Sequence, residues 1–235
     1  PCLTVIVTTA QGLKMHGGVE PDKIKEPNEA GLVAGLPNLG KHIRNLKSFG
    51  QNIVVAFNKY SYDAEDEIET VRNYCKRLKV GFAVNNAYMQ GGAGAEELAA
   101  LVADTIDKEP SLPLQFTYRD GDSIEDKIDK VAKGIYGARQ VIFSTRALKM
   151  LSLVDKMGIS HYPVCIAKTQ YSFSGDPKAY GVVDGFDLDI KDIIINNGSE
   201  MIVAVAGDMM RMPGLPKEPQ ATKIDITDGI IEGLS

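Results

Sequence analysis

Three segments that carry polar, aromatic and glycine residues come directly after predicted strands, and these are where the sequence could do chemistry. The first is Leu13 to Gly18 (LKMHGG). Lys14 could meet an anion as a point charge, and His16 could donate a hydrogen bond or relay a proton. The paired glycines would permit close approach of the backbone to a ligand. The alternative is a connecting loop that carries an exposed lysine.

The other two segments add aromatic rings. In Asn58 to Asp63 (NKYSYD), Tyr60 and Tyr62 could frame a flat ring, and Asp63 is expected to cap the next helix. In Ala87 to Gly94 (AYMQGGAG), Tyr88 precedes a glycine-rich turn whose free amides could bind an anion. Structural roles remain the alternative for both segments. Because successive strand ends of a parallel sheet share one edge, we expect the three segments to lie along one rim.

Two later loops are weaker candidates. Cys165 to Ser174 (CIAKTQYSFS) would hold a buried thiol at Cys165. Met209 to Lys217 (MMRMPGLPK) contains a proline-rich turn that fixes its own backbone, so it could form an adenine-sized slot with little ordering cost. A purely structural role is the alternative for both loops.

One segment imitates a phosphate-binding loop. Gly35 to His42 (GLPNLGKH) has the GxxxxGK skeleton, but His42 stands where Ser or Thr would hold Mg²⁺. The segment also lies within a helical pattern and not between a strand and a helix. The chain therefore lacks the sequence motif with which many proteins bind a nucleoside triphosphate.

Strands alternate with helices along the chain. This alternation predicts an α/β fold with a mainly parallel sheet and helices on its faces. A boundary near residue 110 divides an α/β region over 1–110 from a second, smaller α/β region over 111–235. The predicted strands are 3–9, 53–58, 80–84, 141–143, 164–167, 186–195, 201–206 and 223–226. The predicted helices are 28–49, with a kink or break at Pro37 and Gly40, 63–79, one after the glycines at 91–94, one from Ser123, and 146–157.

Composition narrows the possible partners. The 26 Lys and Arg against 31 Asp and Glu give a net charge of -5, which argues against nucleic acid. The three cysteines are widely spaced and fit a reducing cytoplasm, and no apolar run is long enough to cross a membrane. Nothing suggests a metal site. Pro1 leads almost directly into an apolar run, which we interpret as the edge of a fragment, of a processed product or of one half of a split subunit.

These segments, in this order, resemble the formate–tetrahydrofolate ligases from about Leu3 to Leu234. The family signature reads approximately V-A-T-x-R-A-L-K-x-H/N-G-G, and residues 7–18 read VTTAQGLKMHGG. GLPNLGKHI, PVCIAKTQYSFSGDP and MPGLPKEP are similar to further landmarks of the family. Tyr60 stands where the family commonly has Phe, and Tyr88 where it commonly has Trp.

The resemblance implies a P-loop NTPase-like ligase of which this chain lacks the phosphate-loop half. ATP, with Mg²⁺, would phosphorylate formate, and N10 of tetrahydrofolate would attack the resulting formyl phosphate. The implied partners are the amino-terminal half of the ligase and further copies of the complete subunit. The site residues are Lys14 and His16 for catalysis, Tyr60, Ser61 and Tyr88 for folate, and Arg211, Met212, Pro213, Gly214, Leu215 and Pro216 for the nucleotide.

Departures from the family pattern leave alternatives open. Gln11 and Gly12 stand where the signature has Arg and Ala, and Gln90 stands where a Lys is usual, so positive charge is lost twice. Weaker anion binding would follow. The alternatives are an inactive relative, a non-catalytic binding or assembly module that keeps the fold, and an unrelated nucleotide-binding α/β domain.

Overall fold

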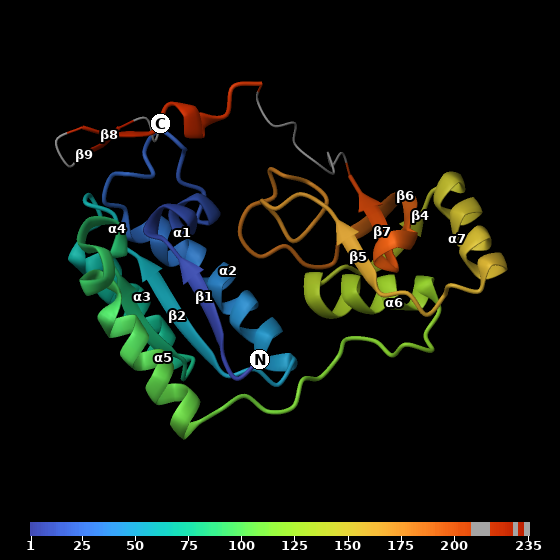
Figure 1. Ribbon diagram of the computed structural model, residues 1–235, viewed down its shortest axis with the longest axis horizontal. Coiled ribbons are helices and arrows are strands. Elements are labelled where there is room, and N and C mark those ends of the chain that lie inside the picture. The colour runs from blue at the N-terminus through green and yellow to red at the C-terminus, as the bar shows by residue number, and fades with distance from the viewer. Residues whose placement is uncertain (208–216, 228–229, 233–235) are drawn as a thin grey trace.

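A computed structural model describes residues 1–207, 217–227 and 230–232 of the chain. Two sheets with their helices lie beside each other, joined by the extended segment 109–122 (Figure 1). The elements of the first are β1 (Thr4–Thr8), α1 (Ala10–His16), α2 (Glu29–Ser48), β2 (Ile53–Asn58), α3 (Glu65–Arg77), β3 (Gly81–Asn85), α4 (Ala87–Gln90) and α5 (Glu96–Lys108). Those of the second are α6 (Ile124–Val131), β4 (Gln140–Phe143), α7 (Thr145–Met157), β5 (Val164–Ala167), β6 (Asp187–Asn196) and β7 (Met201–Ala206).

The first sheet is parallel, in the order β1-β2-β3. Its central strand, β2, is buried on both faces, as its continuous apolar sequence IVVAFN predicts. Leu32, Leu36 and Ile43 of α2 and Ile68 and Val71 of α3 pack in one apolar cluster with this strand. The predicted strands and the two long helices of this region are confirmed.

Helix α2 runs from Glu29 to Ser48 with Pro37 inside it, so the break expected as one possibility at Pro37 and Gly40 does not occur. The kink, the other possibility, stays a prediction. Asn28 caps its first turn by accepting a hydrogen bond from the amide of Gly31 at 2.8 Å. The segment that imitates a phosphate-binding loop lies inside this helix, as predicted.

Helix α1 packs against α2 through direct backbone contact. A Cβ atom on Gly35 would lie 1.8 Å from the carbonyl oxygen of Leu13, and one on Gly17 would lie 1.8 Å from that of Gly31. The expectation that the glycine pair accommodates a ligand is therefore wrong for Gly17, which accommodates a helix. The expected loop at 13–18 is also wrong over its first residues, since Leu13 to His16 complete α1.

The second sheet is mixed and has the order β4-β6-β7-β5. Strands β4 and β6 and strands β5 and β7 pair in parallel, whereas β6 and β7 are antiparallel. The mainly parallel sheet predicted for the first region is thus confirmed, and two of the three strand pairings in the second sheet are parallel as well. Ser123 caps α6, as predicted, and a π-helical turn (Ala132–Tyr136) extends that helix.

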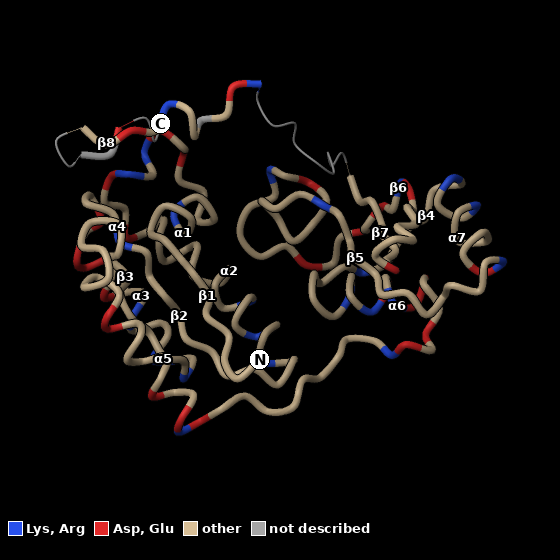
Figure 2. The backbone as a smooth tube through the Cα atoms, viewed as in Figure 1, with Lys and Arg blue, Asp and Glu red and all other residues tan. Residues whose placement is uncertain are grey.

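A short antiparallel hairpin of β8 (Asp225–Thr227) and β9 (Ile230–Glu232) completes the described elements. β9 was not predicted from the sequence. Lys and Arg are interspersed with Asp and Glu along both regions (Figure 2). Among the described residues, no helix is both long and apolar enough to cross a membrane. The division at residue 110 stays a prediction.

Candidate functional site

The carboxyl ends of β1, β2 and β3 lie at one edge of the first sheet, because the three strands are parallel and in register. The ends of β2 and β3 are tied together. The side chain of Asn85 donates to that of Asn58 at 2.8 Å, and the amide of Lys59 donates to the Asn85 carbonyl at 3.0 Å. The three strand ends therefore share one edge of the sheet, as predicted.

Tyr60 and Tyr62 stack on each other, with ring centroids 5.5 Å apart and planes inclined by 8°. This contact leaves no space for a third ring, so the expectation that the two frame a ligand is wrong. Tyr62 also accepts a hydrogen bond from Gln11. Tyr60 and Ser61 remain exposed at the tip of the turn. One face of the Tyr60 ring is therefore occupied by protein, and a ligand ring could only use the other.

Asp63 closes this turn and does not cap the following helix. Its Oδ2 atom accepts from the amide of Tyr60 at 2.8 Å, whereas the N-cap of α3 is Ala64. The helix begins with three acidic residues, and their negative charges stabilise its amino-terminal end by interacting with the helix dipole. The predicted capping role is wrong because the carboxylate is used within the turn.

Tyr88 lies on α4, just after β3, and 81% of its surface is exposed. The glycines that follow form a 3-10 helix (Gly91–Ala95), and the amide of Asn86 donates to the Gly94 carbonyl at 2.9 Å. The ring of Tyr88 is thus presented to solvent on a short, internally bonded segment. Such a ring is free to stack on a planar ligand.

Lys14 points into the protein and is only 1% exposed. Its ammonium donates to the Glu26 carbonyl at 2.8 Å and lies 3.2 Å from Oε2 of Glu67. The other carboxylate oxygen of Glu67 accepts from the amide of Asn28 at 2.7 Å. Lys14 is therefore neither the exposed loop lysine nor the anion-binding lysine that the sequence offered as alternatives. A catalytic role for Lys14 stays a prediction.

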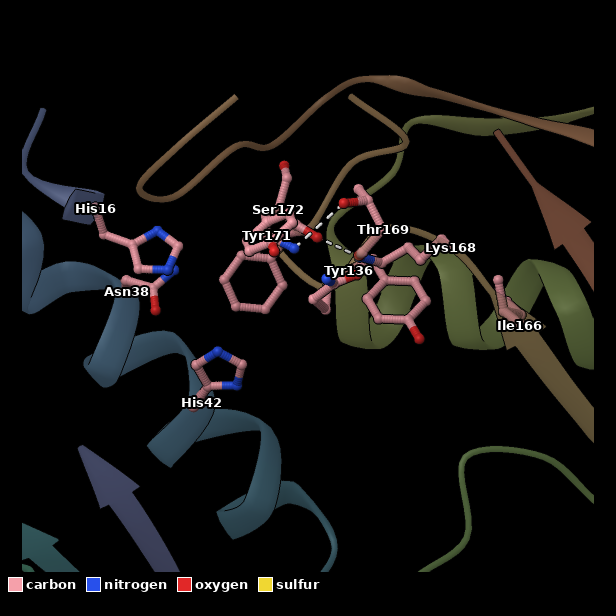
Figure 3. A pocket seen from close by; sticks show the side chains of 11 residues that line it. His16, Asn38, His42, Tyr136, Ile166, Lys168, Thr169, Tyr171 and Ser172 are labelled. Atoms are coloured by element: carbon pink, nitrogen blue, oxygen red, sulfur yellow. Dashed lines mark hydrogen bonds between the residues drawn. The ribbon is translucent and has the colours of Figure 1, made fainter. Parts of the chain in front are cut away.

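His16, at the end of α1, lines a cavity of about 270 Å³ between the two α/β regions (Figure 3). Asn38 and His42 of α2 line the same side, and residues of the 168–173 loop lie opposite. Tyr60 and Tyr88 are not among the residues that line it. The structure therefore separates His16 from the two predicted folate-stacking rings.

Hydrogen bonds from α2 hold the two walls of this cavity in place. Asn38 donates to the Gly181 carbonyl at 3.1 Å. Lys41 donates to the carbonyls of Tyr136 and Val183, at 2.8 and 3.2 Å, and to the Asp184 carboxylate at 2.6 Å. Lys41, which belongs to the segment that imitates a phosphate-binding loop, thus joins the two regions. The i, i+4 spacing of Asn38 and His42 could have indicated a shared face of α2, but it did not indicate what that face would meet.

The pKa values of the ionisable groups around the cavity are displaced toward neutral forms. Partial burial lowers the pKa of His16. Loss of hydration lowers the pKa of His42, and the charges of His16, Lys41 and Lys168 lower it further. Burial, assisted by the charge of Lys41, lowers the pKa of Lys168 to about 8.

Cys165 is exposed on β5, so its prediction as a buried thiol is wrong.

The predicted nucleotide site lies outside the described residues. Arg211, Met212, Pro213, Gly214, Leu215 and Pro216 all belong to it. The adenine slot expected there stays a prediction.

Known proteins match the whole chain. A family model described as formate--tetrahydrofolate ligase matches residues 1–235. The chain is 64% identical to the formate--tetrahydrofolate ligase of Bacteroides fragilis, 63% to that of Bacteroides thetaiotaomicron and 54% to that of Porphyromonas gingivalis. Each comparison covers 100% of this chain and 42% of the relative, so the chain spans less than half the relatives' length. The chain belongs to the formate–tetrahydrofolate ligase family.

Proposed function

We propose that the chain is part of an ATP-dependent ligase that joins formate to tetrahydrofolate, giving 10-formyltetrahydrofolate, ADP and phosphate. A formate oxygen attacks the terminal phosphorus of ATP, and ADP leaves. N10 of tetrahydrofolate then attacks the carbonyl of formyl phosphate, loses its proton, and phosphate departs. The family match over residues 1–235 carries this proposal.

The chain's own contribution would be the pterin-stacking rim. Tyr60 and Tyr88 follow adjacent, cross-bonded strands, and both rings have exposed surface. A pterin stacked between the open face of Tyr60 and Tyr88 would gain aromatic contact on both sides. Ser61, exposed beside Tyr60, could donate or accept a hydrogen bond at the edge of the ring.

The catalytic proposals for Lys14 and His16 differ in kind. His16 Nδ1 accepts from the amide of Gly181 at 3.1 Å, so the neutral ring carries its proton on Nε2 and can donate it to a ligand. Lys14 would act as a positioning residue, because its ammonium is already committed to Glu67 and Glu26. It would hold α1, and with it His16, against α3.

ATP would be shared between this chain and the rest of the ligase. The adenine would meet residues 211–216, and the phosphates with Mg²⁺ would be held by the amino-terminal part. Within the described ranges 1–207, 217–227 and 230–232, no group of three or more His, Cys, Asp or Glu residues could hold a metal ion. The cytoplasmic location and the homo-oligomer stay predictions.

The amino-terminal part of the ligase would dock on β1. This strand is at the edge of a parallel sheet, a position that normally needs cover on both faces and at its free hydrogen-bonding groups. Val5 and Val7 on its outer face are 40% and 60% exposed, and the strand TVIVT carries no charge that would discourage pairing. A strand from the remaining part of the ligase would satisfy both requirements.

Reconstitution tests the proposed function. The chain is mixed with the remaining part of the Bacteroides fragilis ligase, and ADP release is measured with and without formate and tetrahydrofolate. Release that requires both substrates is expected. A complex that forms by size-exclusion chromatography but releases no ADP at any ratio would instead support the non-catalytic assembly module.

A further inference from the structure

The cavity beside His16 is rich in cationic and hydrogen-bond-donating groups. Its walls include His16, Asn38, His42, Tyr136, Lys168 and Tyr171, and none of its described lining residues is Asp or Glu. This bias is notable in a chain whose net charge is -5. The carboxylate of Asp184 is nearby, but it is paired with Lys41.

The two histidines approach the cavity from neighbouring helices (Figure 3). His16 is fixed by the amide of Gly181, which leaves its Nε2–H as the free donor, and Tyr180 contacts its ring edge-on. His42 packs on Phe173 with ring centroids 4.8 Å apart. Loss of hydration lowers the pKa of His42, and the charges of His16, Lys41 and Lys168 lower it further. A charged His42 is therefore unfavourable here unless an anion accompanies it.

Lys168 supplies charge from the opposite wall. Its ammonium donates to the carbonyls of Thr169, at 2.9 Å, and Ser172, and it lies 4.8 Å from the centre of the Tyr136 ring. An ammonium has three protons, so one remains after these two bonds. No carboxylate is bonded to Lys168 in the described contacts. The carbonyls therefore orient this charge without neutralising it.

We propose that this cavity binds a small oxyanion, a carboxylate or a phosphate, through His16, His42, Lys168 and Tyr171. An anion would favour the charged forms of these groups and would accept hydrogen bonds from donors on both walls. Pockets for drug-sized ligands span roughly 300–1,000 Å³, so a cavity of about 270 Å³ suits a smaller ligand. Binding of such an anion does not require the ligase reaction, because it can be measured without turnover.

The chain has only three histidines, which makes their titration by NMR a direct test. The imidazole resonances of the ¹⁵N-labelled chain are assigned with the variants His16→Gln, His42→Gln and His161→Gln. Each pKa is then measured in chloride, inorganic phosphate, formate or L-glutamate at equal ionic strength. The anions separate phosphate from carboxylate as the preferred ligand.

A bound anion stabilises the imidazolium form, so the pKa of His16 and of His42 should rise with the preferred anion. His161 is exposed and does not line the cavity, so its resonances should not distinguish one anion from another, and it serves as the internal control. Equal shifts at all three histidines, or no shift at His16 and His42 with any anion on the order of 50 mM, would overturn the proposal.

Lys168→Met tests the opposite wall, with Lys149→Met on the exposed face of α7 as the matched control. Loss of a charge-assisted hydrogen bond should raise the dissociation constant of the preferred anion about 10- to 100-fold in Lys168→Met only. If Lys168→Met fails to fold, the dissociation constant is measured for His42→Gln instead, because the side chain of His42 is exposed. Unchanged affinity in a folded Lys168→Met or His42→Gln chain would contradict the assignment.

Discussion

The ammonium of Lys14 and the carboxylate of Glu67 form an ion pair at 3.2 Å inside the protein, with side chains only 1% and 2% exposed. Lys14 belongs to α1 and Glu67 to α3, so the pair joins two helices that flank the first sheet. The remaining bonds of both groups go to backbone atoms of Glu26 and Asn28. The pair therefore also holds the segment that leads into α2.

Removal of one charge from this pair should strongly destabilise the fold. Glu67→Gln leaves the buried Lys14 ammonium without its counter-charge, and we expect a loss of about 3–5 kcal/mol in the free energy of unfolding. Urea denaturation measures this. The control is Glu65→Gln, which breaks the exposed pair with Lys59 and should cost less than about 1 kcal/mol. Equal losses in the free energy of unfolding would show that the buried pair stabilises the fold no more than the exposed pair does.

A methyl group at the contact of α1 and α2 should be poorly tolerated. Gly35→Ala places a Cβ atom 1.8 Å from the Leu13 carbonyl oxygen, so the helices must separate, at a cost of about 3 kcal/mol or more. Gly92→Ala is the control, since a Cβ there meets nothing within 4 Å. It should change stability by less than about 0.5 kcal/mol. Thermal unfolding of both variants decides whether the helix contact is as close as described.

Tyr88→Ala should weaken folate binding without affecting the fold. The ring is 81% exposed, so its removal leaves stability nearly unchanged, whereas loss of a stacking partner should cost about 1–3 kcal/mol of binding. Calorimetry with tetrahydrofolate on the reconstituted ligase measures this. Phe116→Ala is a matched control, because Phe116 is 80% exposed and lies away from the rim. Undiminished binding in both Tyr88→Ala and Tyr60→Ala would exclude the stacking site.

Cys75 should be unreactive in the folded chain. Burial raises the pKa of its thiol to about 12, so little reactive thiolate forms near neutral pH, whereas Cys2 and Cys165 are exposed. An aromatic disulfide reagent should therefore titrate two thiols rapidly and the third only after unfolding. The Cys75→Ala chain should show the same two rapid thiols and no third.

The same raised pKa predicts a pH dependence of stability. The folded chain retains the thiol proton that the unfolded chain loses near pH 9, so this contribution to stability is complete below about pH 9 and is lost as pH rises toward about 12. Comparison of denaturation curves for the unmodified chain and Cys75→Ala isolates it. A difference between the two that does not change over this range would contradict the assigned shift.

Val7→Glu should impair docking of the remaining part of the ligase. A carboxylate on the outer face of β1 would be buried without a partner, and association should weaken at least about tenfold. Val33→Glu, at a position of α2 that is 47% exposed, is the control and should associate normally. Both variants can be compared by size-exclusion chromatography with the remaining part of the Bacteroides fragilis ligase. Normal association of Val7→Glu would place the docking surface elsewhere.

Local sequence determined much of this protein. Apolar runs such as Ile53 to Asn58 and the helical periodicity of residues 28–49 placed strands and helices within a few residues, because side-chain spacing reports which faces are buried. The motif VTTAQGLKMHGG and its companions were sufficient to indicate the family, which the match over residues 1–235 confirms.

Tertiary structure alone decided what individual side chains meet. Lys14 is buried because Glu67, 53 residues later, lies beside it, and Gly17 is small because α2 packs on it. The cavity depends on the approach of α2 to the loop at 168–173, which follows from how the two sheets are joined. Residue type and spacing describe only near neighbours along the chain, whereas burial and pairing depend on contacts between distant segments.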